Sequence, residues 1–240
     1  MTFPIKQIPL AFEPQNQYLR QDFMVSSCNR EALKIVELWP QWPFFAQLIF
    51  GPKGSGKTHL AHIFAEHVGS VLQKPIQAKL IHANDLKTSK ISYLHAHHPY
   101  LVVENVSARA DEEALFHLFN IYQNEGGFIL FTSEMPFARL GFKLPDLCSR
   151  LSMIPSVPIL APDDQMLSML IVKLFSDRCI VISQDVLNYT VQNMERSFSY
   201  AIKLVQAADE ISLALKRTVT VPVIKEAMRQ LNHHIQQELF

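Results

Sequence analysis

The chain has 240 residues, 48% of them hydrophobic and 18% charged, and this composition excludes a mostly disordered protein. The length suits one large domain, or one domain with a small appendage. Lys and Arg balance Asp and Glu at 22 each, so bulk charge favours attachment neither to nucleic acid nor to a membrane surface. The three cysteines are widely spaced without a CxxC pattern, which disfavours a disulfide framework or a zinc site. Without a signal-peptide pattern or a long apolar run, a cytoplasmic protein is expected.

Residues 1–22 are expected to form an extended tail, because three prolines recur within the first fourteen positions. Each proline removes a backbone donor and disfavours a helix. The pattern changes at Phe23, and apolar residues then recur at helical spacing over residues 29–39. Asn29 is a suitable cap for this predicted helix, and Pro40 ends it.

Short apolar runs then alternate with helical stretches. Apolar runs bounded by turn residues predict buried strands. The predicted strands cover residues 44–50, 78–83, 100–103, 127–131 and 153–157, the last of them weakened by its prolines. The main helices between them are predicted at residues 57–68 and 111–124. Strands that alternate with helices indicate an α/β domain with a parallel sheet and helices on both faces.

The alternation ends at Pro162. Helical periodicity continues beyond it without strands, and each predicted helix begins near a plausible cap. These helices are predicted at residues 163–177, 183–193, 197–216 and 221–231. The sequence therefore predicts three parts, which are a tail over residues 1–22, an α/β domain over residues 23–161 and a small all-helical domain over residues 162–240.

A phosphate-binding motif directly follows the first predicted strand. It fits GxxxxGK[ST], and its residues are Gly51, Pro52, Lys53, Gly54, Ser55, Gly56, Lys57 and Thr58. The glycines let successive backbone N–H groups point at phosphate oxygens, and the following helix adds positive potential at its N-terminus. Lys57 is expected to reach the β- and γ-phosphates, and Thr58 to ligate Mg²⁺. The motif thus predicts a nucleotide-binding site for ADP or ATP with Mg²⁺, and its position between strand and helix argues against a chance glycine-rich turn.

An acid at the end of a second strand is expected to hold the hydrated metal. Glu104 follows the third predicted strand and is the candidate Mg²⁺ ligand beside Thr58, while a strand-end carboxylate without a metal role is the alternative. The next residue is Asn105, at the position where hydrolytic P-loop proteins carry a Glu that activates water. Because an amide cannot take a proton, we expect nucleotide binding with slow or negligible intrinsic hydrolysis.

Four segments together carry a family resemblance. They are residues 51–58, 103–107, 131–136 and 144–151. They resemble the AAA+ module of the bacterial replication initiator DnaA, and more closely the Hda family of DnaA-like proteins that switch the initiator off. The similarity runs from about residue 23 to residue 231. It implies a P-loop AAA+ fold, with a RecA-like parallel sheet flanked by helices and a small C-terminal helical lid domain.

The resemblance also implies roles for single residues. The stretch around Asn29 would pack beside the adenine, and Ser133 falls on the first sensor of the γ-phosphate, although strand ends are commonly polar. Arg150 falls on the arginine finger, whose forked guanidinium suits charge developing in a neighbouring molecule's site, and a surface ion pair is its alternative. Arg196 falls on the second sensor at the start of a lid helix, where a local cap or ion pair is the alternative.

The tail carries a second specific pattern. Gln7, Leu10 and Phe12 match Gln-x-x-Leu-x-[Phe/Leu], which resembles peptides that bind the sliding clamp, the β subunit of the replicative DNA polymerase. Such a peptide binds extended in a groove, where Gln7 forms hydrogen bonds at one edge while Leu10 and Phe12 fill an apolar pocket. A three-position match also arises by chance, so the prediction depends on its place ahead of an Hda-like module.

Three functions compete. The first is a negative regulator of replication initiation that binds nucleotide and the clamp, and promotes hydrolysis of initiator-bound ATP in trans through Arg150. The second is an autonomous ATPase or loader that acts by its own turnover, which Asn105 disfavours. The third, a DNA-binding initiator, is the least favoured, since the expected helix-turn-helix domain would begin where this sequence ends. The first implies DnaA and the clamp as partners and a place near the nucleoid, and homodimerisation stays open.

Overall fold

The computed structural model describes residues 18–238, with side chains through residue 232. The predicted clamp-binding residues Gln7, Leu10 and Phe12 lie outside this part of the chain. The helices and strands are, in order, α1 (Arg30–Leu38), β1 (Ala46–Phe50), α2 (Lys57–Leu72), β2 (Lys79–His82), α3 (Ile91–His97), β3 (Tyr100–Val106), α4 (Glu112–Glu125), β4 (Phe128–Ser133), α5 (Pro145–Ser152), β5 (Ser156–Pro158), α6 (Asp164–Ser176), α7 (Gln184–Asn193), α8 (Phe198–Leu215) and α9 (Val221–Glu238). Short 3-10 helices cover Arg20–Asp22, Ala83–Asp85, Thr88–Lys90 and Phe137–Arg139.

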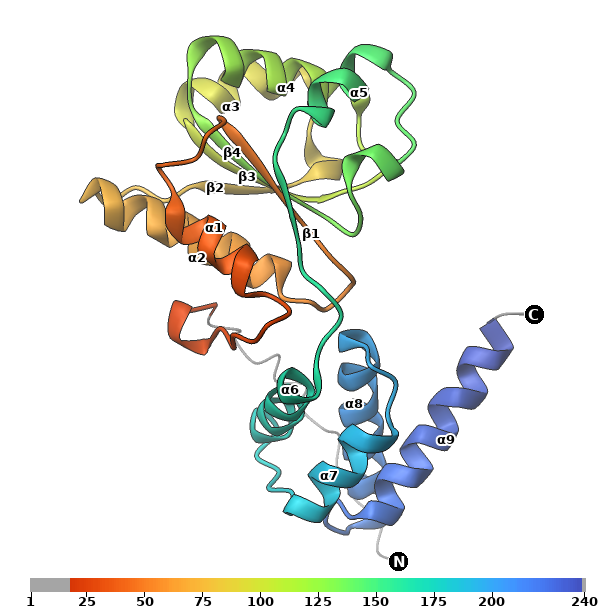
Figure 1. Ribbon diagram of the computed structural model, residues 1–240. Coiled ribbons are helices and arrows are strands. Elements are labelled where there is room, and N and C mark those ends of the chain that lie inside the picture. The colour runs from red at the N-terminus through yellow and green to blue at the C-terminus, as the bar shows by residue number, and fades with distance from the viewer. Residues whose placement is uncertain (1–17, 239–240) are drawn as a thin grey trace, which may run out of the picture.

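A five-stranded parallel sheet in the order β2-β3-β4-β1-β5 forms the centre of the larger domain, which confirms the predicted α/β architecture. Helices α1 and α2 cover one face of the sheet, and α3, α4 and α5 cover the other (Figure 1). Because side chains alternate along a strand, Leu48 packs in the core shared with α4 and α5, while its neighbour Ile49 packs in the core shared with α1 and α2. Both faces are buried, which is why the strands read as continuous apolar runs.

The edge strand β5 is shorter than predicted. It covers Ser156–Pro158 instead of residues 153–157, and it pairs with β1 at the end of the sheet. Pro155 and Pro158 each lack a backbone donor, so the strand is confined to a short segment at the edge.

Residues 18–22, which we expected in the tail, pack against the larger domain. The ring of Tyr18 stacks on His62 of α2, with ring centroids 4.4 Å apart. The Arg20 side chain donates from Nε to Glu37 of α1 at 2.6 Å. The folded part of the chain therefore includes these residues.

The predicted all-helical domain is confirmed as a bundle of α6, α7, α8 and α9 (Figure 1). Three of its helices begin at the predicted caps, because the side chains of Asp163, Ser183 and Ser197 each accept a hydrogen bond from a backbone N–H three residues later. Helix α9 continues to Glu238, beyond its predicted end at residue 231.

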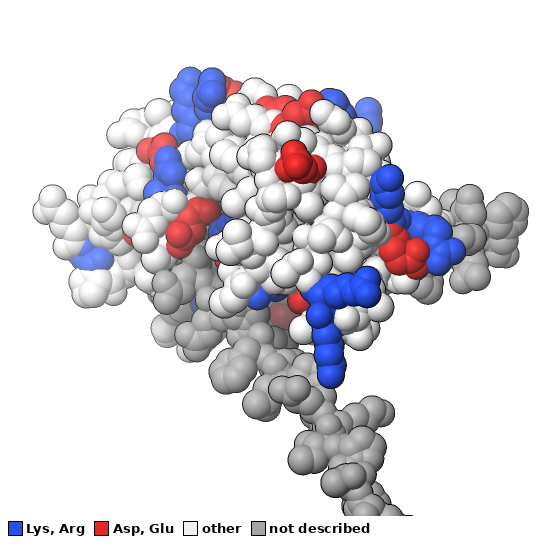
Figure 2. Space-filling view, turned by 90° about the horizontal axis from the view of Figure 1, so that it is seen from below, with Lys and Arg blue, Asp and Glu red and all other residues white. Residues whose placement is uncertain are grey.

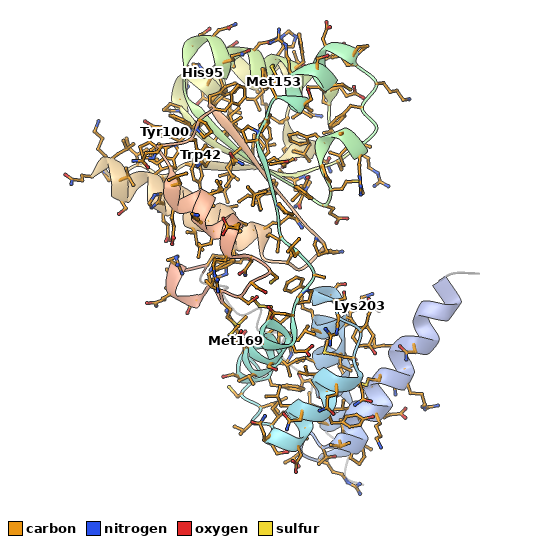
Figure 3. All side chains as sticks on the ribbon, in the orientation of Figure 1. Trp42, His95, Tyr100, Met153, Met169 and Lys203 are labelled. Carbon is orange, nitrogen blue, oxygen red and sulfur yellow. The ribbon has the colours of Figure 1, made fainter. Side chains whose placement is uncertain are left out.

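The two domains meet at a small apolar cluster. Cys28 of the larger domain packs with Phe198 of α8, and Met169 of α6, labelled in Figure 3, packs beside them. A polar contact joins the same two parts, since Ser27 Oγ donates to Asp163 Oδ2 at 2.6 Å. This junction sets the lid helices beside the carboxyl end of β1.

Charged side chains of both signs are interspersed over the mostly uncharged face at the helical end of the molecule (Figure 2). This agrees with the equal numbers of basic and acidic residues in the sequence. None of the helices within residues 18–238 is long and apolar enough to span a membrane.

Candidate nucleotide-binding site

The P-loop motif lies at the carboxyl end of β1, between that strand and α2. Two of its glycines have left-handed backbone angles, with φ of +81° at Gly54 and +91° at Gly56. A side chain at either position would be strained, which explains why glycine is required there. The Gly51 N–H donates to the Ser133 carbonyl at 3.2 Å and so fixes the start of the loop to β4. The loop leads directly into the N-terminus of α2, as phosphate binding requires.

Lys57 begins α2 and is buried, with 7% of its surface exposed. Its Nζ donates to the carbonyls of Gly51 at 2.8 Å and Pro52 at 2.9 Å, so the ammonium lies inside the loop. Burial lowers the pKa of Lys57, while the negative charge of Glu134 acts in the opposite direction. A buried cation held only by neutral carbonyls gains a stronger partner when a phosphate enters.

A cavity of about 1120 Å³ lies over the loop. This volume accommodates a nucleotide. Its lining comes from four parts of the chain, which are residues 18–29 near the N-terminus, the P-loop with the start of α2, the ends of β3 and β4, and helices α6 and α8. The site is therefore formed by both domains together.

The acidic end of β3 has an unusual geometry. Glu104 carries a buried Oε1 without a hydrogen-bond partner among the described residues, and its side chain does not line the cavity. Asn105 does line the cavity, and it has a φ of +56° at an irregularity in the pairing of β3 with β4. Its N–H donates to the buried Thr132 Oγ1 at 3.1 Å, which holds this conformation. A buried carboxylate oxygen without a donor is a suitable ligand for a hydrated cation.

Of the residues to which the resemblance assigns a role, only some lie at the cavity. Asn29 lines the cavity, but its side chain accepts from the Ser26 N–H and donates to the Met24 carbonyl, so it organises the loop before α1. Ser133 is fully buried and donates to the Met135 carbonyl. Neither Ser133 nor Arg196 lines the cavity, and Arg196 forms an ion pair with Asp164 at 3.0 Å. Glu134, the residue that follows β4, does line the cavity.

Arg150 lies away from this cavity, on α5. Its guanidinium carbon is 5.1 Å from the ring centroid of Phe116 and 5.6 Å from that of Phe119, both on α4. Its Nη1 donates to Gln123 Oε1 at 3.1 Å. These contacts fix the cation at the surface formed by α4 and α5, on the other face of the sheet from α1 and α2 (Figure 1).

Sequence reasoning missed most of the cavity wall that lies opposite the P-loop. Helix α6 contributes Met166, Leu170 and Leu174 to this wall, and the residue after each of them packs in the core of the helical domain. Two apolar stripes on one helix are more than the bundle itself needs. That excess was the one signal in the sequence for a second buried face of α6.

The family model of the Hda lid domain matches residues 163–228. The helical domain is therefore similar to the lid domain of Hda proteins. The structure as a whole is similar to domain III of the replication initiation protein DnaA from Thermotoga maritima, with a TM-score of 0.73 at 17% identity over 90% of this chain and 97% of that chain. No match is found among curated proteins.

Two further structures with the same fold have lower scores. AMPPCP-bound DnaA from Aquifex aeolicus has a TM-score of 0.65 at 17% identity, covering 92% of this chain and 72% of that chain. The RuvB Holliday junction branch migration motor from Thermotoga maritima also has a TM-score of 0.65 at 17% identity, covering 89% of this chain and 72% of that chain. The fold is thus the predicted AAA+ fold, and its helical domain matches the Hda lid domain, as the sequence resemblance implied.

Proposed function

We propose that this Hda-type chain is a negative regulator of chromosome replication initiation. It binds ADP or ATP with Mg²⁺ in the cavity between its domains and attaches to the sliding clamp through Gln7, Leu10 and Phe12. In that position it promotes hydrolysis of ATP held by DnaA. The Hda lid domain and the DnaA-like fold support this assignment.

The position of Arg150 is the observation that carries the proposal. The side chain does not line the chain's own cavity, and its guanidinium is held against Phe116, Phe119 and Gln123 on α4. An arginine in this position acts on phosphate only if the phosphate belongs to another molecule. Because it is already fixed in orientation, it loses little side-chain entropy when it forks onto phosphoryl oxygens.

The chain's own nucleotide has a structural part in this mechanism. Lys57 would exchange its two loop carbonyls for the phosphates, and Thr58 would hold Mg²⁺, which would neutralise phosphate charge. Glu104 does not line the cavity, so it would hold the ion through coordinated water. Asn105 faces the cavity where a water-activating carboxylate is otherwise found, so the bound nucleotide is turned over slowly.

The deciding experiment measures ATP hydrolysis by purified DnaA in the presence of this protein, loaded clamp and DNA. Arg150→Ala is expected to remove stimulation almost completely, since comparable arginine fingers contribute on the order of 10³–10⁵ in rate. Arg150→Lys is also expected to stimulate poorly, because an ammonium does not fork across two oxygens. Arg30→Ala on α1, at the opposite face of the sheet, is the matched control and should stimulate normally.

Full stimulation by Arg150→Ala in this assay would overturn the assignment of Arg150 as the finger. A second experiment tests the tail. Replacing Gln7, Leu10 and Phe12 with Ala should abolish clamp binding in a pull-down while ADP affinity is unchanged. Retained clamp binding would move that contact to another part of the chain.

An autonomous ATPase is the second candidate, because one of the acidic residues that line the cavity, Glu134, lies near Lys57. Glu134 lies close enough to Lys57 for its negative charge to oppose the lowering of the Lys57 pKa by burial. If Glu134 activates water, the isolated protein should hydrolyse ATP at the rate of an ordinary AAA+ motor, and Glu134→Gln should abolish that turnover. Slow turnover by the isolated protein, with strong stimulation of DnaA, excludes this candidate.

A further inference from the structure

Residues 18–23, which we call the strap, run along the first turns of α2 ahead of α1 (Figure 1). The Tyr18 ring stacks on His62 with an interplanar angle of 15° and meets His59 edge-on at 5.5 Å. His59 Nε2 lies 2.8 Å from the Leu19 carbonyl. Since a carbonyl only accepts, His59 carries its proton on Nε2 in this contact. Two histidines one helical turn apart thus fasten the start of the strap to α2.

The other end of the strap reaches the P-loop. Phe23 is 7% exposed and meets His59 edge-on, with ring centroids 5.1 Å apart. A Cβ added at Gly56 would lie 3.2 Å from the Phe23 ring, so this ring packs directly on the P-loop. The strap therefore follows the nucleotide site from α2 to the loop that would hold phosphate.

The strap also joins the two domains. Arg20 pairs with Glu37 of α1, and the Asp22 carbonyl accepts from Lys173 Nζ of α6 at 3.3 Å. Tyr18, Asp22 and Phe23 all line the cavity. His62 does not line the cavity itself, but its ring stacks on that of Tyr18, which does.

We propose that the stack of Tyr18 on His62 holds the strap as one wall of the nucleotide cavity and thereby sets the residence time of the bound nucleotide. The inference rests on the proposed nucleotide binding, and it names the contact that controls how fast the nucleotide is released. A strap that leaves α2 opens the cavity along the side between α2 and α6, and a nucleotide is released more often when that wall opens more often. His62 is a positioning residue in this scheme, because its effect reaches the nucleotide through Tyr18.

The test measures the release rate of N-methylanthraniloyl-ADP, displaced by excess ADP in a stopped-flow chase with the full-length protein. His62→Ala and Tyr18→Ala should each release it on the order of threefold to tenfold faster, as the loss of one aromatic pair predicts. The double variant should be no faster than either single variant, because both remove the same contact. Tyr18→Phe keeps the ring and should restore slow release.

Tyr93→Ala is the matched control, since Tyr93 stacks on His97 of α3 at 4.1 Å and does not line the cavity. It should leave the release rate unchanged. A wild-type release rate in His62→Ala overturns the strap inference, even when the thermal stability of that variant is lowered. Absence of any N-methylanthraniloyl-ADP binding to the unaltered protein overturns the proposed nucleotide site and the strap inference together.

Discussion

The nucleotide cavity has two sides that are built in different ways. Its floor is the P-loop, one continuous segment over residues 51–58 whose shape depends on backbone conformation and two glycines with positive φ. Its opposite side is formed by the strap and the lid helices, which lie more than a hundred residues apart in the sequence and contribute side chains. The floor suits any phosphate group, whereas the opposite side is complete only when the two domains are assembled.

This difference separates two properties of the site. Changes to the floor should decide whether a nucleotide binds at all, because the backbone N–H groups and Lys57 are its phosphate partners. Changes to the strap or lid should alter how long the nucleotide stays bound and how strongly its binding is coupled to the contact between the domains. Three variants test this division, beginning with the largest expected effect.

Lys57→Ala should abolish ADP binding to the P-loop. At an ADP concentration a hundred times the dissociation constant, binding stabilises the native state by about 2.7 kcal/mol, which raises the melting temperature by roughly 5–10 °C in a chain of this size. This shift should vanish in Lys57→Ala, and differential scanning fluorimetry with and without ADP measures it. An ADP shift equal to that of the unaltered protein would remove Lys57 from the site.

Gly54→Ala tests the place where the floor and the lid touch. The added Cβ would lie 3.2 Å from Ile202 Cδ1 and 3.3 Å from Phe198 Cβ, both on α8, and the φ of +81° adds strain. We expect a loss of about 2–3 kcal/mol in the free energy of unfolding, measured by urea denaturation.

Gly141→Ala is its matched control. Gly141 has a similar φ of +74°, but a Cβ there would have nothing within 4 Å. It should cost only the backbone strain of about 1–2 kcal/mol. Equal losses in the two variants would mean that the lid does not press on the P-loop in solution.

The same division explains what sequence reasoning could predict. The P-loop, the parallel sheet and the lid helices each follow from local patterns, such as the capping of α6 by Asp163, and the structure confirms the sheet and the helical domain. The order of strands around β1 and the place of residues 18–22 against α2 do not follow from local patterns. Both depend on contacts between residues far apart in the chain. The strap also has no periodic sequence pattern that would predict its position.

The roles taken from resemblance show the same limit. A sequence position predicted Arg196 as a sensor, but whether a guanidinium reaches the cavity depends on the competing carboxylate of Asp164, which only the assembled lid places at 3.0 Å. The contacts of Arg150 could not be predicted from spacing either. The rings of Phe116 and Phe119, against which its guanidinium packs, belong to α4, a different helix. Its role in trans stays a prediction for the hydrolysis assay.

Ser27→Ala is expected to have the smallest effect, at the junction that keeps the lid beside the P-loop. The hydrogen bond from Ser27 Oγ is the main cause that lowers the pKa of Asp163, with a second contribution from the Met166 N–H. A carboxyl whose pKa is lowered in the folded state stabilises the protein above its unfolded-state pKa, near 3.9, and this contribution is lost as the pH falls through the folded-state value. At pH 7 the loss should be about 0.5–1 kcal/mol, since the pair is solvent-exposed.

The pH dependence distinguishes this contact from an ordinary surface hydroxyl. Urea unfolding between pH 7 and pH 3 should show the difference between Ser27→Ala and the unaltered protein narrowing below about pH 4, where Asp163 takes up a proton in both. Ser168→Ala is the control, because Ser168 Oγ donates to the Asp164 backbone carbonyl within α6, an acceptor that does not titrate. Its cost should stay constant across the same range. A cost of Ser27→Ala that is equally independent of pH would mean that the Ser27 hydroxyl does not bond to the Asp163 carboxylate in solution, and the lid would then be held to the larger domain chiefly by the apolar contacts around Cys28.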